Sequence, residues 1–304
     1  MVPARLFDKK VLLFDSAIGT ALQAAGQPPG TRSEEMNLLA PEEVFRIHSE
    51  NIEAGSDVVT SNTFGVSAQL LLGKTEHALQ CLEAGLRIAR EAAGKGMFCL
   101  GIGPAGMLLG PLGDVSYEAA EEAYARQAEA GASMGADFIL LETFSDAEEF
   151  ARAARAAIGA SGLPVLGTMT FTEAGRTFMG ASPADMVRAA RESGLAAIGA
   201  NCSLGPSEII PIVREIIAEN NKGNTTGTVT GKNVRAGYAP LPVIVQPNAG
   251  LPACEGGETV YRVGAAEFAA GAGRLLALGV AGIGGCCGTT PAMIAAIRGM
   301  IDNG

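Results

Sequence analysis

Residues 137–169 decide the fold, and they read DFILLETFSDAEEFARAARAAIGASGLPVLGTM. A short apolar run at 137–141 and a second at 164–169 are both typical of buried strands. Between them, apolar residues recur every three or four positions and so share one face of a helix. These residues are Ala147, Phe150, Ala151, Ala154 and Ile158. A strand, a helix and another strand in this order predict a βαβ unit with parallel strands.

The same unit recurs along the chain. Six more short apolar runs have the composition of strands, and most of them precede a segment with helical periodicity. These runs cover residues 11–15, 57–61, 97–101, 197–201, 242–246 and 282–285. Hydroxyl-proline pairs at Ser182-Pro183 and Thr290-Pro291 are typical helix starts. Eight strands that alternate with helices predict an α/β fold, the (β/α)8 TIM barrel, which typically needs about 250 residues.

The 304-residue chain contains no linker or shift in composition. We therefore expect a single domain at residues 11–304, with residues 1–10 as an N-terminal extension. The segment 219–238 is rich in Asn, Gly, Thr and Lys and cannot bury a core. We expect it to form a mobile loop on the face opposite the chemistry.

Composition excludes several classes of function. The chain is 48% hydrophobic and 18% charged, which excludes a disordered protein. Its formal charge of −10, without a Lys/Arg cluster, argues against binding to nucleic acid or to an anionic membrane. Neither a signal peptide nor an apolar span of about 20 residues is recognisable, so a cytoplasmic location is expected.

Polar or thiol side chains follow six of the eight predicted strands. Because barrel enzymes place their chemistry at the carboxyl ends of the strands, we expect these side chains to share one rim. Two carboxylates on that rim would pair with an ammonium group and repel a phosphate. Taken singly, each carboxylate could instead cap a helix or bond a loop. The side chains are Asp15, Asn62, Thr63, Glu142, Asn201, Cys202, Asn248, Cys286 and Cys287.

The thiols among these residues predict a metal site. Cys286 and Cys287 lie between glycines that permit the backbone distortion needed to bring both thiols to one side. Cys202 ends a strand two places away in the barrel, so it can converge on the pair. Three thiolates with an open fourth position are typical of catalytic zinc. The alternatives are a vicinal disulfide or two ordinary buried cysteines.

The other cysteines and the two histidines are expected to lie outside this site. Cys81 and Cys99 fall within a helix and a strand as core thiols, and Cys254 follows the seventh strand without a role. His48 and His77 both fall on helices away from the rim. The absence of a histidine base at the rim argues against a triad hydrolase.

The motifs resemble the homocysteine S-methyltransferase family over nearly the whole chain. The most specific elements are GGCCGTTP at 284–291 and GANC at 199–202. Supporting elements are DSAIGT at 15–20, SNTF at 61–64 and LETF at 141–144. The segment QPNAGLP at 246–252 is most similar to the cobalamin-dependent methionine synthase branch.

This resemblance implies a zinc ion on Cys202, Cys286 and Cys287 that activates the thiol of homocysteine. Asp15 and Glu142 would bind the ammonium group of the substrate. The other substrate contacts implied are Ala17, Gly19, Thr20, Asn62, Thr63, Asn201 and Asn248. The backbone N–H groups near 17–20 would orient the carboxylate, and Asn248 or a water could fill the fourth metal position.

The methyl donor implied by the methionine synthase branch is methylcobalamin or another methylcorrinoid. Because the chain stops shortly after the zinc motif, the donor would be carried on a separate protein or on adjoining folate and cobalamin domains. Betaine or S-methylmethionine as donor, and a different thiol as acceptor, remain open. So do a non-catalytic metal-binding barrel and a thiol-redox protein that cycles a disulfide between Cys286 and Cys287.

Overall fold

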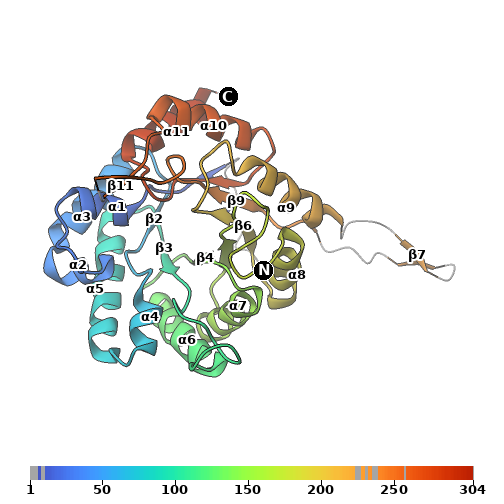
Figure 1. Cartoon of the computed structure of the whole chain (residues 1–304), viewed down its shortest axis with the longest axis horizontal. Helices are drawn as coiled ribbons and strands as arrows, with labels where there is room; N and C mark the ends of the chain where they lie inside the picture. Colours follow the sequence, from blue (N-terminus) through green and yellow to red (C-terminus); the bar gives the residue numbers. More distant parts are fainter. Residues whose placement is uncertain are drawn as a thin grey trace.

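The computed structural model describes residues 6–7, 11–222, 227–229, 232–234, 239–256 and 258–303. Eight parallel strands form one sheet in the order β1-β12-β9-β6-β5-β4-β3-β2. Two hydrogen bonds link the ends of this sheet: the Leu13 N–H donates to Asp57 Oδ2 at 2.9 Å, and the Asp57 N–H donates to the Leu13 carbonyl at 2.7 Å. The chain is therefore a (β/α)8 TIM barrel, with helices surrounding the strands (Figure 1).

All eight barrel strands fall within or overlap the predicted runs. Several strands are shorter than predicted because the hydrogen bonds between neighbouring strands stop before the apolar run of residues ends. They are β1 (Leu12–Leu13), β2 (Val58–Thr60), β3 (Met97–Ile102), β4 (Phe138–Phe144), β5 (Val165–Met169), β6 (Ala197–Asn201), β9 (Val243–Gln246) and β12 (Gly282–Ile283).

Most helices lie outside the strands and bury one face against them, whereas α1 and α2 pack against α3 and α5. Ser182 begins α8 as predicted, because its Oγ accepts the Asp185 N–H at 3.2 Å while the Asp185 carboxylate accepts the Ser182 N–H at 2.9 Å. The helices are α1 (Ile18–Ala24), α2 (Met36–Leu39), α3 (Pro41–Glu53), α4 (Val66–Leu71), α5 (Thr75–Ala93), α6 (Tyr117–Ser133), α7 (Ala147–Ser161), α8 (Pro183–Ser193), α9 (Ile210–Lys222), α10 (Ala265–Leu276) and α11 (Pro291–Asn303), with a 3-10 turn at Ser33–Glu35.

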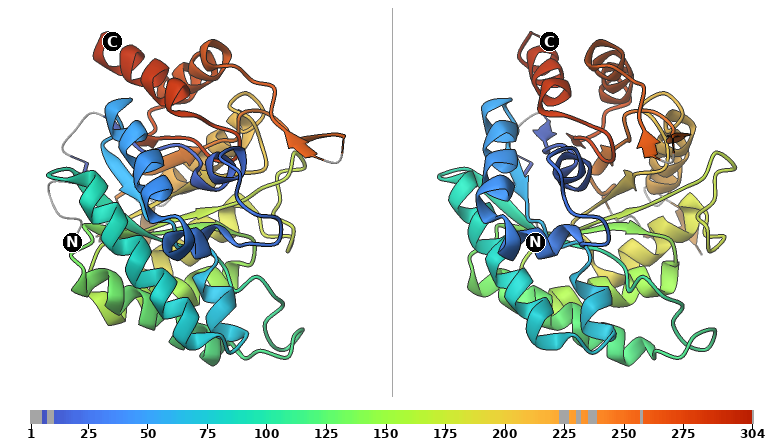
Figure 2. Two further views of the ribbon diagram at one scale, coloured as in Figure 1. Left: turned by 90° about the vertical axis from the view of Figure 1, so that its left-hand side faces the viewer. Right: turned by 60° about the vertical axis from the view of Figure 1, so that its left-hand side comes forward.

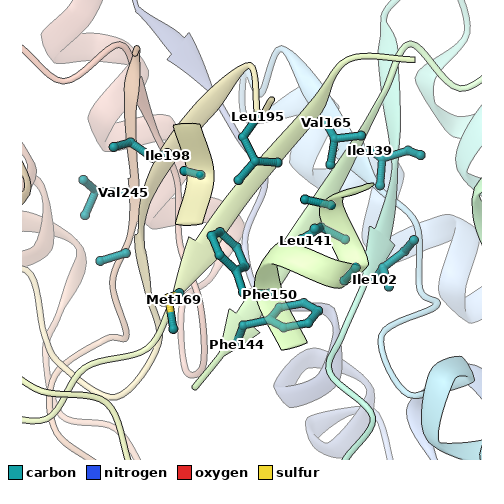
Figure 3. Close-up of a cluster of buried hydrophobic side chains, with 14 of the residues drawn as sticks. Ile102, Ile139, Leu141, Phe144, Phe150, Val165, Met169, Leu195, Ile198 and Val245 are labelled. Atoms are coloured by element: carbon teal, nitrogen blue, oxygen red, sulfur yellow. The ribbon is translucent and has the colours of Figure 1, made fainter. Parts of the chain in front are cut away.

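Helix α7 shows how residues 137–169 pack. Phe150 is fully buried, and its ring lies 5.7 Å from that of Phe144 at the end of β4 (Figure 3). The ring occupies the space where a side chain at Gly167 of β5 would otherwise lie. The apolar stripe on α7 thus meets the outer face of β4 and β5. No helix in the described part of the chain is both long and apolar enough to cross a bilayer.

The prediction of a loop over 219–238 is wrong in part. Residues 219–222 belong to α9, and Gly227–Val229 (β7) pairs antiparallel with Lys232–Val234 (β8). Asn220, near the end of α9, makes a tertiary bond, since its Nδ2 donates to the Leu241 carbonyl at 2.8 Å. Residues 223–226, 230–231 and 235–238 lie outside the described residues, as do 1–5 and 8–10 of the predicted extension. Leu6 of that extension packs against Leu12 and Phe14.

A second antiparallel pair, β10 (Ala253–Glu255) and β11 (Glu258–Val260), follows β9 and carries the exposed Cys254. Figure 2 shows this orange hairpin on the same side of the barrel as the green loop after β3 and the yellow-green loop after β5. The connections that follow the strands therefore gather at one end of the barrel.

Replacing Gly199 by alanine is expected to destabilise the barrel by about 3 kcal/mol or more. A Cβ at this position in β6 would lie 1.7 Å from the carbonyl oxygen of Ile244 in β9, so the two strands would have to separate. Urea unfolding followed by far-UV circular dichroism measures the effect. Gly159→Ala in α7 is the matched control: nothing lies within 4 Å of its new Cβ, and it should stabilise the protein by about 0.5–1 kcal/mol. Equal unfolding midpoints for the two variants would contradict this account.

Candidate metal and substrate site

Three cysteines converge at the carboxyl ends of β6 and β12. One Sγ atom from each of Cys202, Cys286 and Cys287 lies within 4.8 Å of the other two, and Cys202 Sγ is 3.8 Å from Cys287 Sγ. Three sulfurs bonded to one tetrahedral zinc at about 2.3 Å would be about 4 Å apart. The donor set and its spacing therefore fit a zinc ion. Among the described residues, this is the one group of His, Cys, Asp and Glu side chains close enough to share a metal.

The backbone brings the thiols together by leaving regular strand geometry. Strand β12 ends at Ile283, so Cys286 and Cys287 lie in a turn, where side chains need not alternate between faces. The Cys286 N–H donates to the Pro247 carbonyl at 2.8 Å, and the Ala249 N–H donates to the Cys287 carbonyl at 2.9 Å. Cys202 has a φ of 62°, a left-handed conformation that non-glycine residues seldom adopt.

Hydrogen bonds among the three thiols shift the pKa values of Cys286 and Cys287 in opposite directions. Hydrogen bonds from Cys202 and Cys286 lower the pKa of Cys287 to about 3. Hydrogen bonding to its two neighbours, together with burial, raises the pKa of Cys286 well above that of a free thiol. One thiolate is thus stabilised by two thiols, while ionising all three would bring three negative charges together. A dication at the centre of the three sulfurs would offset that repulsion.

A cavity of about 400 Å³ lies against the three cysteines. It is within the size range of small-molecule sites. No Lys, Arg or His occurs among the described residues that line it, whereas three carboxylates do. Seven of the nine predicted substrate residues line the cavity, and Asn201 and Asn248 do not. The seven are Asp15, Ala17, Gly19, Thr20, Asn62, Thr63 and Glu142.

Asp15 and Glu142 are the two carboxylates that the sequence predicts at this rim. Burial raises the pKa of Asp15 to about 7, although Thr60 donates to its two oxygens at 2.7 and 2.8 Å. Burial, together with the charge of Asp15, raises the pKa of Glu142 to about 8. No hydrogen bond within the described structure engages the Glu142 carboxylate, so its oxygens are available to a ligand. An ammonium group between these carboxylates would favour their ionised forms.

Other polar side chains of the cavity, Asn62 and Thr63, already form hydrogen bonds within the fold. Asn62 Nδ2 donates to the Ser33 carbonyl at 2.6 Å, and Thr63 Oγ1 donates to the Gly101 carbonyl at 2.7 Å. No side chain caps the first turn of α1, which follows Ala17. The Ala17 N–H itself donates to Thr289 Oγ1 at 3.1 Å. The N–H groups of 18–20 are thus better placed than that of Ala17 to meet a carboxylate.

Asn201 and Asn248 are buried and do not line the cavity. The Asn201 amide bonds Thr143, Thr168 and Cys286, so its polar groups are used within the protein. The Asn248 Oδ1 is buried and has no partner among the described residues. Its proposed contact with a ligand or metal therefore remains a prediction.

Sequence reasoning missed Glu34, the third carboxylate of the cavity. It is 4% exposed and accepts a hydrogen bond from Gln69 Nε2 at 2.7 Å. Glu34 lies directly over Gly65, where any side chain would collide with its carboxylate. No strand-end pattern could identify it, because it comes from the 3-10 turn between α1 and α2.

The residues expected outside the site do lie outside it. Cys81 and Cys99 are buried in α5 and β3. His48 is buried in α3, and burial lowers its pKa to about 4. His77 lies on α5, 3.4 Å from Glu35 Oε1. Neither histidine lines the cavity.

Solved structures of similar fold include the homocysteine methyltransferase MmuM from Escherichia coli. Its metallated form matches with a TM-score of 0.73 at 22% identity, covering 98% of this chain and 99% of that one. Its oxidised form matches with a TM-score of 0.69 at 21% identity, covering 98% of each chain. At these identities the likeness supports the barrel fold.

Sequence comparison is more specific. A methionine synthase from Mycobacterium tuberculosis is 30% identical over 318 aligned positions, covering 98% of this chain and 25% of that protein. One from Mycobacterium leprae is 30% identical, with coverages of 93% and 24%. The chain thus spans about a quarter of the length of these relatives. The sequence profile described as "Homocysteine S-methyltransferase" matches residues 12–301. The chain therefore belongs to the homocysteine S-methyltransferase family.

Proposed function

We propose that this barrel transfers a methyl group to the thiol of homocysteine, giving methionine, with zinc as its metal. The observation that carries the proposal is the convergence of three thiol sulfurs within 4.8 Å on the wall of a cavity that, in the described residues, is lined by three carboxylates and by no Lys, Arg or His. Such a cavity suits a ligand with one end that binds a metal through sulfur and another end that is cationic. Homocysteine has both ends.

Cys202, Cys286 and Cys287 would hold the zinc ion, which when bound supplies Lewis acidity that lowers the pKa of a substrate thiol. Asp15 and Glu142 would pair with the substrate ammonium, and the first turn of α1 would orient the carboxylate. No histidine lines the cavity to act as a base in the described structure. The chain's own contribution is then to fix the substrate relative to the metal and the incoming methyl group.

We propose a methylcorrinoid donor that reaches the site from outside this barrel. Exposed apolar side chains surround the end of the barrel where the site lies, on the loops after β2, β3, β5 and β9. Large apolar groups at one end of a domain are typical of a surface that meets a partner. The methionine synthase relatives are about four times as long as this chain, which supports a donor carried elsewhere. The side chains are Phe64, Leu108, Leu112, Phe178, Met179 and Leu251.

One observation favours a second candidate donor. Glu34 adds a third carboxylate to the cavity, more than one ammonium group requires. A small cationic donor, either the sulfonium S-methylmethionine or the quaternary ammonium betaine, would use that excess of negative charge.

The test combines zinc analysis with a panel of donors. The zinc-loaded protein and homocysteine are incubated with methylcobalamin, S-methylmethionine or betaine, and methionine is measured by mass spectrometry. We expect about one zinc per chain and methionine from methylcobalamin alone. Methionine from a cationic donor would replace the corrinoid proposal with the second candidate. A metal-bound protein inactive with all donors would favour a binding role or another thiol acceptor, and a metal-free protein that cycles a disulfide would overturn the proposal.

A further inference from the structure

We propose that Asn201 is a positioning residue that ties Glu142, on the ammonium side of the site, to Cys286 on its metal side. This inference rests on the proposed function, because it assigns Asn201 a task between a metal ligand and a substrate contact. It also replaces the expectation that Asn201 itself touches the substrate.

The Asn201 side chain is the last of β6, is 1% exposed and uses its whole amide. Its Oδ1 accepts from the Thr143 N–H at 2.9 Å and from Thr168 Oγ1 at 2.8 Å. Its Nδ2 donates to Thr143 Oγ1 at 2.8 Å and to Cys286 Sγ at 3.8 Å. Two acceptor contacts and two donor contacts exhaust the capacity of an amide group. Asn201 is therefore held in one orientation.

Thr143 is the strained end of this network. Its φ of 66° places a β-branched residue in the left-handed region, which needs support from the surrounding structure. The pairing of β4 with β5 shifts register between Leu141 and Phe144, so Glu142 and Thr143 occupy an irregularity in the strand. Irregularities of this kind redirect side chains. By binding both the N–H and the hydroxyl of Thr143, Asn201 holds the irregular segment of β4 that presents Glu142 to the cavity.

Cys286 is the residue at the other end of this hydrogen-bond network. An N–H that donates to a metal-bound thiolate orients the sulfur and reduces its negative charge, and the loss of such a partner typically weakens metal binding about 10- to 100-fold. Among the described residues, Asn201 is the side chain that hydrogen-bonds both Thr143, next to Glu142, and a cysteine of the cluster. A disturbance at Asn201 should therefore be felt by the metal and by the substrate together.

The decisive variant is Asn201→Asp, which keeps an acceptor for the Thr143 N–H and for Thr168 but puts an oxygen where Nδ2 faces Cys286. We expect zinc affinity, measured by chelator competition, to fall about 10- to 100-fold. The sulfur-to-cobalt absorption band of the cobalt-loaded protein should shift, and the KM for homocysteine should rise. Thr168→Val is the matched control. It removes one bond to the same amide and leaves Nδ2 in place, so zinc affinity and the cobalt band should stay unchanged.

Thr143→Val keeps the proposal testable if Asn201→Asp does not fold. It preserves side-chain shape and removes the bond to Nδ2, so the KM for homocysteine should rise while zinc affinity changes by less than about threefold. Wild-type metal affinity and an unshifted cobalt band in a folded Asn201→Asp protein would overturn the link to Cys286. An unchanged KM in Thr143→Val would overturn the link to Glu142. A wild-type protein that binds no zinc would instead defeat the proposed function itself.

Discussion

Replacing Cys286 by serine is expected to lower bound zinc from about one ion per chain to nearly none and to abolish methionine formation. The half-buried Cys286 completes a three-thiol cluster, and two remaining thiolates cannot enclose a zinc ion. A serine hydroxyl does not ionise near neutral pH, so it provides no equivalent ligand. Without the metal, the homocysteine thiol keeps its ordinary pKa, and the concentration of attacking thiolate falls.

Metal content after gel filtration, measured by plasma mass spectrometry beside the methionine assay, checks this prediction. Cys254→Ser is the control, because Cys254 is exposed on β10 and lies outside the cluster. It should retain zinc and activity in full. Full zinc retention by the Cys286→Ser protein would remove Cys286 from the ligand set.

The sequence predicts the barrel well because its determinants are local. The apolar run at 137–141 predicts a strand, and the apolar stripe on α7 predicts a helix. Eight repeats of this strand-helix unit predict a closed barrel. The end of α9 was missed because Asn220 looks like a loop residue, yet its side chain is bonded to Leu241, 21 positions later. Such a tertiary bond has no signature in the local pattern.

The candidate site was predictable to the extent that its residues end strands. Cys202 and Cys286 follow the ends of β6 and β12, Glu142 lies near the end of β4, and the structure brings all three to one cavity. Glu34 lies on a 3-10 turn and therefore escaped the strand-end rule. Asn201 does end a strand, but its amide bonds Thr143, whose left-handed backbone has no signature in the sequence. Backbone strain of this kind becomes visible only in three dimensions.

Replacing Glu142 by glutamine is expected to raise the KM for homocysteine about 10- to 100-fold, with zinc content unchanged. The Glu142 carboxylate lines the cavity and makes no hydrogen bond within the described residues. A charge-assisted contact with the substrate ammonium would contribute about 1.5–3 kcal/mol, which corresponds to that loss. Steady-state kinetics at saturating donor measure it. Glu148→Gln, which alters an exposed ion pair with Arg152 on α7, should leave KM unchanged.

The same Glu142→Gln change should stabilise the metal-free protein at pH 8, by about 1 kcal/mol or more. Burial raises the pKa of Glu142 from 4.5 to about 8. Between pH 4.5 and pH 8, the folded state therefore retains a proton that the unfolded state has lost. The contribution of Glu142 to the stability of the wild type therefore falls as pH rises from about 4.5 to 8, and glutamine, which cannot ionise, avoids that loss. The gain in thermal midpoint should be large at pH 8 and small at pH 4. Higher stability with weaker homocysteine binding would show that this carboxylate is kept for its ligand, whereas a variant destabilised at pH 8 would indicate a role in holding the fold.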